Sequence, residues 1–145
     1  MAYKLFIDTN VYLDLLMQRG TDWLQVKSIF ELAERNELEI YTSASSVLNI
    51  MYVLKNYKFE RKVIVDNACA ILSFAKLVNP GNITFEIALL SAFRDLEDAV
   101  QYYTALEIKG INYFITSNTK DYRNELPILK VLSPEEFMKK YGEQP

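Results

Sequence analysis

Segments typical of buried β-strands alternate with segments of helical periodicity along the whole chain. The expected strands are residues 3–7, 38–41, 76–78, 112–116 and 128–132, and the expected helices are residues 10–18, 22–36, 44–55, 61–74, 85–93, 96–108 and 134–141. Such alternation predicts an α/β fold in which a parallel sheet lies between layers of helices. The 145 residues fit one domain with a sizeable core, residues 1–145.

Several residues indicate where these helices begin and end. Residues 133–136 form a capping box with proline at the first helical position. Thr84 is expected to cap the helix 85–93, and Gly110 is expected to end the helix 96–108.

The residue types present exclude several classes of chemistry. The chain contains no histidine, which excludes Ser-His-Asp catalysis, histidine acid–base catalysis and histidine-ligated zinc. Its single cysteine, Cys69, has no partner for an internal disulfide or a cysteine-rich zinc site. The apolar neighbours of Cys69 favour a buried position for it. Any bound metal must have oxygen ligands, which favours magnesium or manganese.

The net charge of −3 limits how the chain would bind nucleic acid. A protein that binds nucleic acid through bulk charge is usually basic, so here the attraction would come from a local basic edge and from bound metal. No apolar run is long enough to cross a membrane, and the amino terminus lacks the pattern of a signal peptide. A cytoplasmic protein without a membrane partner is expected.

Asp8 directly follows the first expected strand and precedes a helix-like pattern. In parallel α/β sheets, ligands bind at the carboxyl ends of the strands, where a carboxylate is well placed to hold a metal ion. The alternative role is helix capping, because an aspartate before a helix accepts hydrogen bonds from free backbone amides.

Two further acidic groups follow later in the chain. Asp95 and Asp98 share one side of the first turn of a helix, where Asp95 and Glu97 also suit a cap or a solvated surface. Asp98 flanks the apolar stripe and is expected to face the sheet edge. Asp121 follows the fourth strand after small polar residues, which also suit a turn. If Asp8, Asp98 and Asp121 lie close together at one edge of the sheet, they form a magnesium site.

Three segments of the chain resemble, in order and spacing, the motifs of PIN domains. These are Phe6-Ile7-Asp8-Thr9-Asn10-Val11, then Asp95-Leu96-Glu97-Asp98-Ala99-Val100-Gln101-Tyr102, then Phe114-Ile115-Thr116-Ser117-Asn118 through Asp121-Tyr122. The resemblance implies a four- to five-stranded parallel sheet in a three-layer α/β/α sandwich. It also implies a Mg²⁺- or Mn²⁺-dependent nuclease that hydrolyses phosphodiester bonds in single-stranded RNA, related to the VapC-like ribonucleases.

The same resemblance assigns roles to individual residues. It implies that Asp8, Asp98 and Asp121 are the catalytic metal ligands, with Asp95 as a further candidate. The supporting polar residues would be Thr9, Asn10, Asn49, Thr116 and Asn118. Many PIN domains are toxins of toxin–antitoxin pairs and many are homodimers, so an antitoxin partner and self-association are expectations from the resemblance.

Asn49 departs from the family pattern. PIN domains usually carry a glutamate on the helix after the second strand, and that place falls on Asn49 here. Asparagine offers a neutral oxygen, so the site has one formal charge fewer. Either Asp95 or Glu97 compensates, or a second ion binds weakly, or the chain is a catalytically degenerate module that binds nucleic acid or protein.

Basic residues suggest where RNA would lie. Arg94, Lys120 and Arg123 flank the acidic motifs and are the candidates for phosphate contacts. The densest basic stretch, residues 55–62, contains interleaved aromatics that suit base stacking. The favoured interpretation of that stretch is nevertheless a solvated helix connection in which Tyr57 and Phe59 pack inwards.

Two other families with an aspartate after the first strand fit less well. A haloacid-dehalogenase-like phosphatase needs a second aspartate at the position of Asn10, and a response-regulator receiver needs paired acids ahead of Asp8. Neither requirement is met.

Overall fold

A five-stranded sheet in which all strands are parallel forms the centre of the molecule. The computed structural model describes residues 2–143. The strands are β1 (Tyr3–Ile7), β2 (Leu38–Ser43), β3 (Ala75–Val78), β4 (Tyr113–Ile115) and β5 (Lys130–Leu132), in the order β3-β2-β1-β4-β5. The predicted parallel sheet is therefore confirmed.

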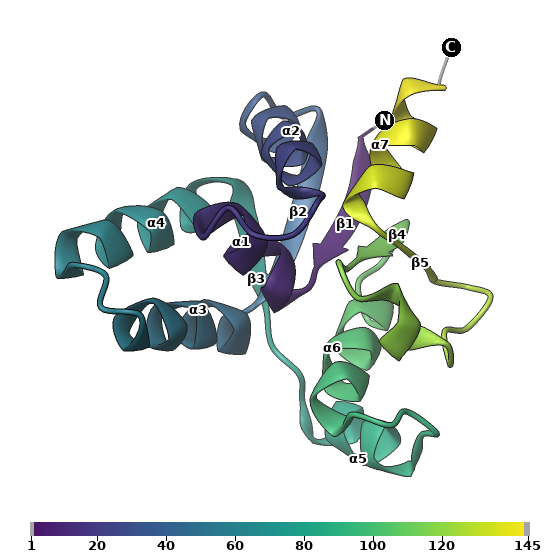
Figure 1. The fold of residues 1–145 in the computed structure, drawn as a ribbon. Helices are drawn as coiled ribbons and strands as arrows, with labels where there is room; N and C mark the ends of the chain where they lie inside the picture. The colour runs from purple at the N-terminus through teal and green to yellow at the C-terminus, as the bar shows by residue number, and fades with distance from the viewer. Residues whose placement is uncertain (1, 144–145) are drawn as a thin grey trace.

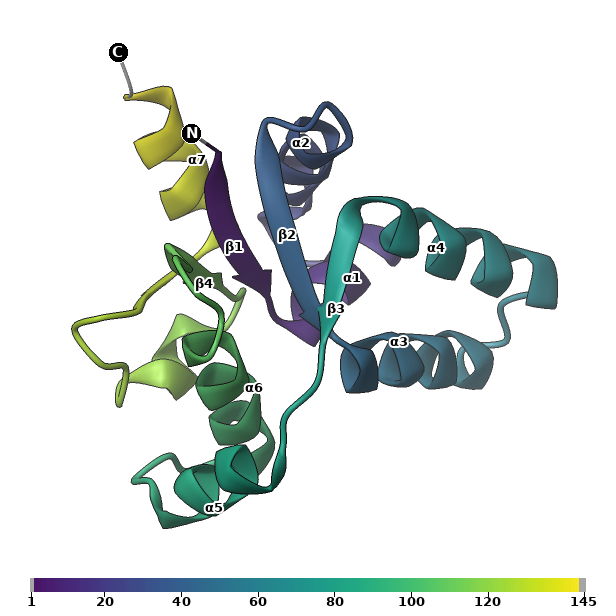
Figure 2. The same cartoon turned by 180° about the vertical axis from the view of Figure 1, so that it is seen from behind.

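Helices cover both faces of this sheet, which confirms the three-layer α/β/α arrangement (Figures 1 and 2). The first face packs against α1 (Thr9–Leu16), α2 (Trp23–Glu34), α3 (Ala44–Asn56), α4 (Arg61–Phe74) and α7 (Pro134–Gly142), and the second against α5 (Asn82–Leu90) and α6 (Leu96–Leu106). A 3₁₀ helix, η1 (Thr119–Tyr122), follows β4. The predicted capping box of α7 is present, with Ser133 and Glu136 bonded to each other's backbone amides.

Strand β1 lies at the middle of the sheet and is buried on both sides. Leu5 and Ile7 contribute to the core on the first face, whereas Phe6 points to the second. Phe6 stacks on Phe114 of β4 at 5.3 Å between ring centroids, and Tyr102 of α6 packs on Phe114. This explains why Leu5-Phe6-Ile7, the buried part of β1, is continuously apolar rather than alternating.

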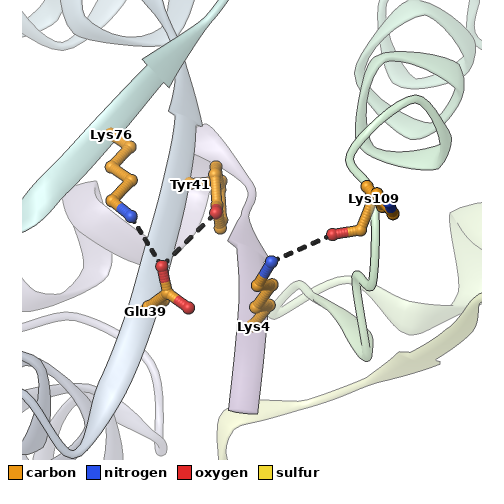
Figure 3. Close-up of polar contacts among 5 residues, drawn as sticks. All are labelled: Lys4, Glu39, Tyr41, Lys76 and Lys109. Atoms are coloured by element: carbon orange, nitrogen blue, oxygen red, sulfur yellow. Dashed lines mark hydrogen bonds and ion pairs between the residues drawn. The ribbon is translucent and has the colours of Figure 1, made fainter. Parts of the chain in front are cut away.

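Polar residues cover the second face near the amino ends of the strands (Figure 3). Lys76 of β3 forms an ion pair with Glu39 of β2 at 2.6 Å, which lowers the pKa of the Glu39 carboxyl. Lys4 of β1 donates through Nζ to the backbone oxygen of Lys109 at 3.1 Å. The carboxyl ends of the strands, at the opposite edge, are where the acidic residues gather.

Three expectations about single residues are wrong. Thr84 does not cap a helix at 85–93, because α5 already begins at Asn82 and Thr84 lies within its first turn, bonded to the amide of Gly81. Cys69 is exposed rather than buried, since α4 buries fully only Ile71. Tyr57 is 61% exposed, although its neighbour Phe59 does pack against the core. Within residues 2–143, no helix combines the length and apolar character needed to span a membrane.

Candidate active site

Asp8 occupies the point where the chain leaves β1 and where β1 and β4 lie side by side. Its backbone amide donates to the oxygen of Ile115, which continues the pairing of β1 with β4 by one residue. The chain crosses from β1 to β2 on one side and returns to β4 on the other, so a crevice opens between β1 and β4 at their carboxyl ends.

The Asp8 side chain is both a helix cap and the floor of this crevice. Its Oδ1 accepts from the amide of Thr9 at 2.8 Å, and its Oδ2 accepts from the hydroxyl of Thr116 at 2.8 Å. The hydroxyl of Tyr122 lies 3.5 Å from the same Oδ2. Capping and site formation, which the sequence offered as alternatives, therefore coexist in one residue.

Helix α6 places its acidic first turn opposite Asp8. Asp95 is the N-cap of α6, and its Oδ1 accepts from the amide of Asp98 at 3.0 Å. This bond turns the first residues of the helix so that Asp98, which is half-buried, faces the crevice. Asp121 reaches the crevice from η1 on the third side and accepts a hydrogen bond from the side-chain amide of Asn118.

These elements enclose an acidic cavity of about 280 Å³. It is lined by five carboxylates, three asparagines and three other polar side chains: Asp8, Asp95, Glu97, Asp98, Asp121, Asn10, Asn49, Asn118, Thr9, Gln101 and Tyr122. Thr116 lies beneath the lining and supports Asp8. Arg94, Lys120 and Arg123 are exposed outside it.

The carboxylates of the acidic cavity repel one another. Burial, followed by the charges of Asp8 and Asp95, raises the pKa of Asp98 from its ordinary value of 3.8 to about 7. Burial raises the pKa of Asp8 to about 6, although Thr116 and Thr9 oppose that rise by hydrogen bonding. Burial beside these acids also raises the pKa of Tyr122, so its hydroxyl keeps its proton.

Three residues of this site were not predicted from the sequence. Gln101, one helical turn after Asp98, donates through Nε2 to the Ser46 hydroxyl at 3.0 Å, and Ser46 bonds Thr9 at 2.7 Å. These bonds fix α6, α3 and α1 against one another. Tyr122 is the third. The spacing of three from Asp98 indicates a shared helix face for Gln101, but the sequence holds no indication that Ser46 meets it.

The donors around the acidic cavity fit a divalent cation by their chemistry. Carboxylate and amide oxygens are the ligands of Mg²⁺ and Mn²⁺, and a cation would relieve the repulsion between Asp8 and Asp98. Within residues 2–143, however, no group of three or more acidic or cysteine side chains is arranged to hold one ion. Asp8, Asp95 and Asp121 are instead engaged in the protein hydrogen bonds described above.

The raised pKa values predict that the protein becomes less stable as the pH rises. Between about pH 4 and pH 7 the folded Asp8 and Asp98 keep protons that the unfolded chain has lost, so the free energy of unfolding decreases as the pH rises. In EDTA, Asp98→Asn should therefore melt above the wild type at pH 8 and match it near pH 4. Because solvent screens part of the repulsion, we expect a difference of about 1 kcal/mol, or roughly 2–4 °C. A difference in Tm that does not change with pH would contradict this.

The comparison with protein-family models identifies the fold. Residues 4–120 match the model of the PIN domain. This chain belongs to the PIN domain family. The match covers most of the chain, including Asp8 after β1 and the acidic residues at the start of α6, and it confirms the resemblance inferred from the sequence motifs. No curated protein sequence matches the chain.

Solved structures with the same PIN fold include three bacterial proteins. A toxin–antitoxin complex from Klebsiella pneumoniae has 24% identity and a TM-score of 0.64 over 90% of this chain and 97% of that one. VapBC2 from Rickettsia felis, bound to a DNA fragment from its promoter, has 15% identity and a TM-score of 0.61 over 90% and 98%. VapC20 from Mycobacterium tuberculosis, a sarcin-ricin loop cleaving toxin, has 15% identity and a TM-score of 0.63 over 84% and 95%.

Proposed function

We propose that this PIN domain is a Mg²⁺- or Mn²⁺-dependent endoribonuclease that hydrolyses phosphodiester bonds in single-stranded RNA. The single observation that carries the proposal is the acidic cavity, in which carboxylates from the end of β1, the start of α6 and η1 meet without a basic side chain among the lining residues. Such a cavity repels a phosphate unless a cation is present. A bound cation would offset the repulsion between the carboxylates and would also attract the phosphate of the substrate.

Asp8, Asp98 and Asp121 would hold the ion, with Asp95 as a further ligand. Thr116 fixes the orientation of Asp8 from below, and Asn10, Asn49 and Asn118 offer neutral oxygens and amide donors at the rim. When bound, the ion supplies a more acidic water and stabilises negative charge on the phosphate. Asn118 donates to Oδ2 of Asp121, and a carboxylate that accepts one hydrogen bond can still offer its other oxygen to a cation, so Asn118 is proposed as a positioning residue for Asp121.

Metal binding tests this proposal directly. At a concentration of one hundred times the Kd, Mn²⁺ should stabilise the wild type by about 2.7 kcal/mol, which raises the Tm by roughly 5–10 °C. Asp98→Ala should lose this shift. Asp14→Ala is the matched control, because Asp14 also lies in a short helix but pairs with Arg19 at 2.9 Å, away from the acidic cavity. A wild-type Tm unchanged by millimolar Mn²⁺ would sink the proposal.

A catalytically degenerate module that binds nucleic acid or protein is the second candidate. It is favoured by Asn49, which lines the acidic cavity with a neutral side chain, and by the lack of a closed ligand set among the described residues. Asn49→Glu separates the two functions. A wild type that binds no Mn²⁺, together with an Asn49→Glu variant that does, would show that the missing charge had inactivated the site.

Arg94, Lys120 and Arg123 are proposed to contact the RNA backbone. All three are exposed and lie close in sequence to Asp95 and Asp121, so a phosphate at the acidic cavity is within their neighbourhood. Their positive charges would offset the negative net charge of the protein where the RNA enters the acidic cavity.

We further propose a protein partner and self-association. Relatives of the same fold were solved as toxin–antitoxin complexes, which supports an antitoxin for this chain and a role as a cytoplasmic toxin. Helix α5 supports a homodimer, because an unusual number of its apolar side chains are exposed: Ile83, Phe85, Ile87, Leu89 and Leu90. Light scattering of the purified protein measures the oligomeric state.

A further inference from the structure

Helix α3 connects the acidic cavity to a projecting part of the molecule. Asn49, in its second turn, lines the cavity, and the helix then runs outwards to the turn that joins it to α4 (Figure 1). At 1.5 Å per residue, Asn49 and the helix end at Asn56 lie about 10 Å apart along the axis. The outer side of α3 is thus continuous with the proposed active site.

One exposed aromatic ring lies on α3, and a second lies at the residue that ends the helix. Tyr52 lies one turn after Asn49 and is 64% exposed, and Tyr57 follows at the end of the helix. By contrast, Tyr12, Tyr102 and Tyr122 are fully buried. These two exposed tyrosines, one on α3 and one at its outer end, offer flat surfaces on which unpaired bases can stack.

The same segment is the most basic part of an acidic protein. Lys55, Lys58, Arg61 and Lys62 are exposed at the turn between α3 and α4, with Glu60 as the one acid among them. Among these four cations, within the described residues, only Lys62 forms an ion pair, with Asp66 at 2.8 Å. Helix α3 itself contains no acidic residue. The charge therefore suits a polyanion.

We propose that the outer side of α3 and its turn with α4 form a binding track for single-stranded RNA that leads out of the acidic cavity. Bases stack on Tyr52 and Tyr57, and phosphates meet Lys55, Lys58 and Arg61. A second copy of the chain fits this surface less well, because a two-fold contact would bring these cations against their own counterparts. This inference rests on the proposed function, because the RNA in the track is the substrate only if the protein is a ribonuclease.

Binding of a fluorescein-labelled single-stranded RNA to the Asp8→Asn protein, which should not cleave it, tests the track. Tyr52→Ala and Tyr57→Ala should each weaken binding at least fivefold and leave the salt dependence unchanged. Tyr52→Phe and Tyr57→Phe keep the ring and should bind as the parent does. Lys55→Ala with Lys58→Ala should weaken binding and reduce the slope of log K against log salt by about 0.7 for each phosphate that the protein no longer neutralises.

The controls and outcomes separate this inference from the proposed function. Lys139→Ala with Lys140→Ala, on α7, removes two exposed cations elsewhere and should change nothing. If the parent binds RNA and all the α3 variants bind within twofold of it, the track is wrong although the nuclease proposal stands. Loss of self-association in the tyrosine variants, with RNA binding intact, would assign the surface to a second copy. If the parent binds no RNA, the track is also wrong, and Mn²⁺-dependent cleavage by the wild type then decides the fate of the nuclease proposal.

Discussion

Replacing Asp8 with asparagine is expected to abolish metal-dependent cleavage of single-stranded RNA without unfolding the protein. The substitution removes the buried charge at the floor of the acidic cavity, and loss of one charge-stabilising group typically lowers kcat at least about a hundredfold. The protein should keep or gain stability, because burial penalises the charged form of Asp8 and raises its pKa to about 6. A gel assay with Mg²⁺ or Mn²⁺, together with a thermal melt, measures both effects.

Asp14→Asn is the matched control for this experiment. Asp14 lies on α1, the helix that Asp8 caps. Its side chain pairs with Arg19 and does not line the acidic cavity. It should cleave as the wild type does. If Asp8→Asn retains activity when purified free of host nucleases, the carboxylate is not a catalytic ligand and the nuclease assignment fails.

Phe114→Ala is expected to give the largest loss of stability, about 3–5 kcal/mol. Phe114 is fully buried on the second face of the sheet, where its ring stacks on Phe6 and lies 4.7 Å from that of Tyr122. The cavity left by the ring sits beneath η1, so the hydroxyl of Tyr122 should also lose its place beside Asp8. Since small domains are stable by only about 5–15 kcal/mol, the loss is a large fraction of the total.

Urea denaturation of Phe114→Ala measures this effect, with Phe114→Leu as a milder variant if the alanine protein does not fold. The leucine substitution keeps most of the volume and should cost less than about 1.5 kcal/mol. Ile128→Ala is the surface control, because Ile128 is 78% exposed and should change stability by no more than about 0.5 kcal/mol. A Phe114→Ala protein whose free energy of unfolding lies within about 1 kcal/mol of the wild-type value would contradict the described packing on the second face of the sheet.

The parts of the site that depend on local pattern were predictable from the sequence. Asp8 follows an apolar run and precedes a helix, and Asp95 and Asp98 begin an amphipathic helix, so their elements were placed correctly. The alternation of strands and helices sufficed for the parallel sheet. The resemblance to the family motifs then indicated that the three acidic segments belong to one site, which hydrophobic periodicity alone does not show.

The parts that depend on contacts between distant elements were not predictable. Gln101 meets Ser46 only because the fold brings α6 close to the start of α3, and the two residues lie 55 positions apart. Tyr57 and Cys69 look like core residues by composition, yet the α3–α4 pair extends beyond the helices that would cover them. Hydrophobic spacing identifies an apolar face, but only the tertiary arrangement decides whether anything covers it.

The hydrogen bond between Asp8 and Thr116 joins residues 108 positions apart. At the usual speed of protein synthesis, Thr116 leaves the ribosome roughly 5–20 s after Asp8 does. Truncated translation products that stop before β4 lack the second wall of the crevice. A growing chain therefore lacks the assembled acidic cavity until most of it has been made. Under the proposed function, the chain gains nuclease activity only after that point, when the ribosome and the message have nearly finished producing it.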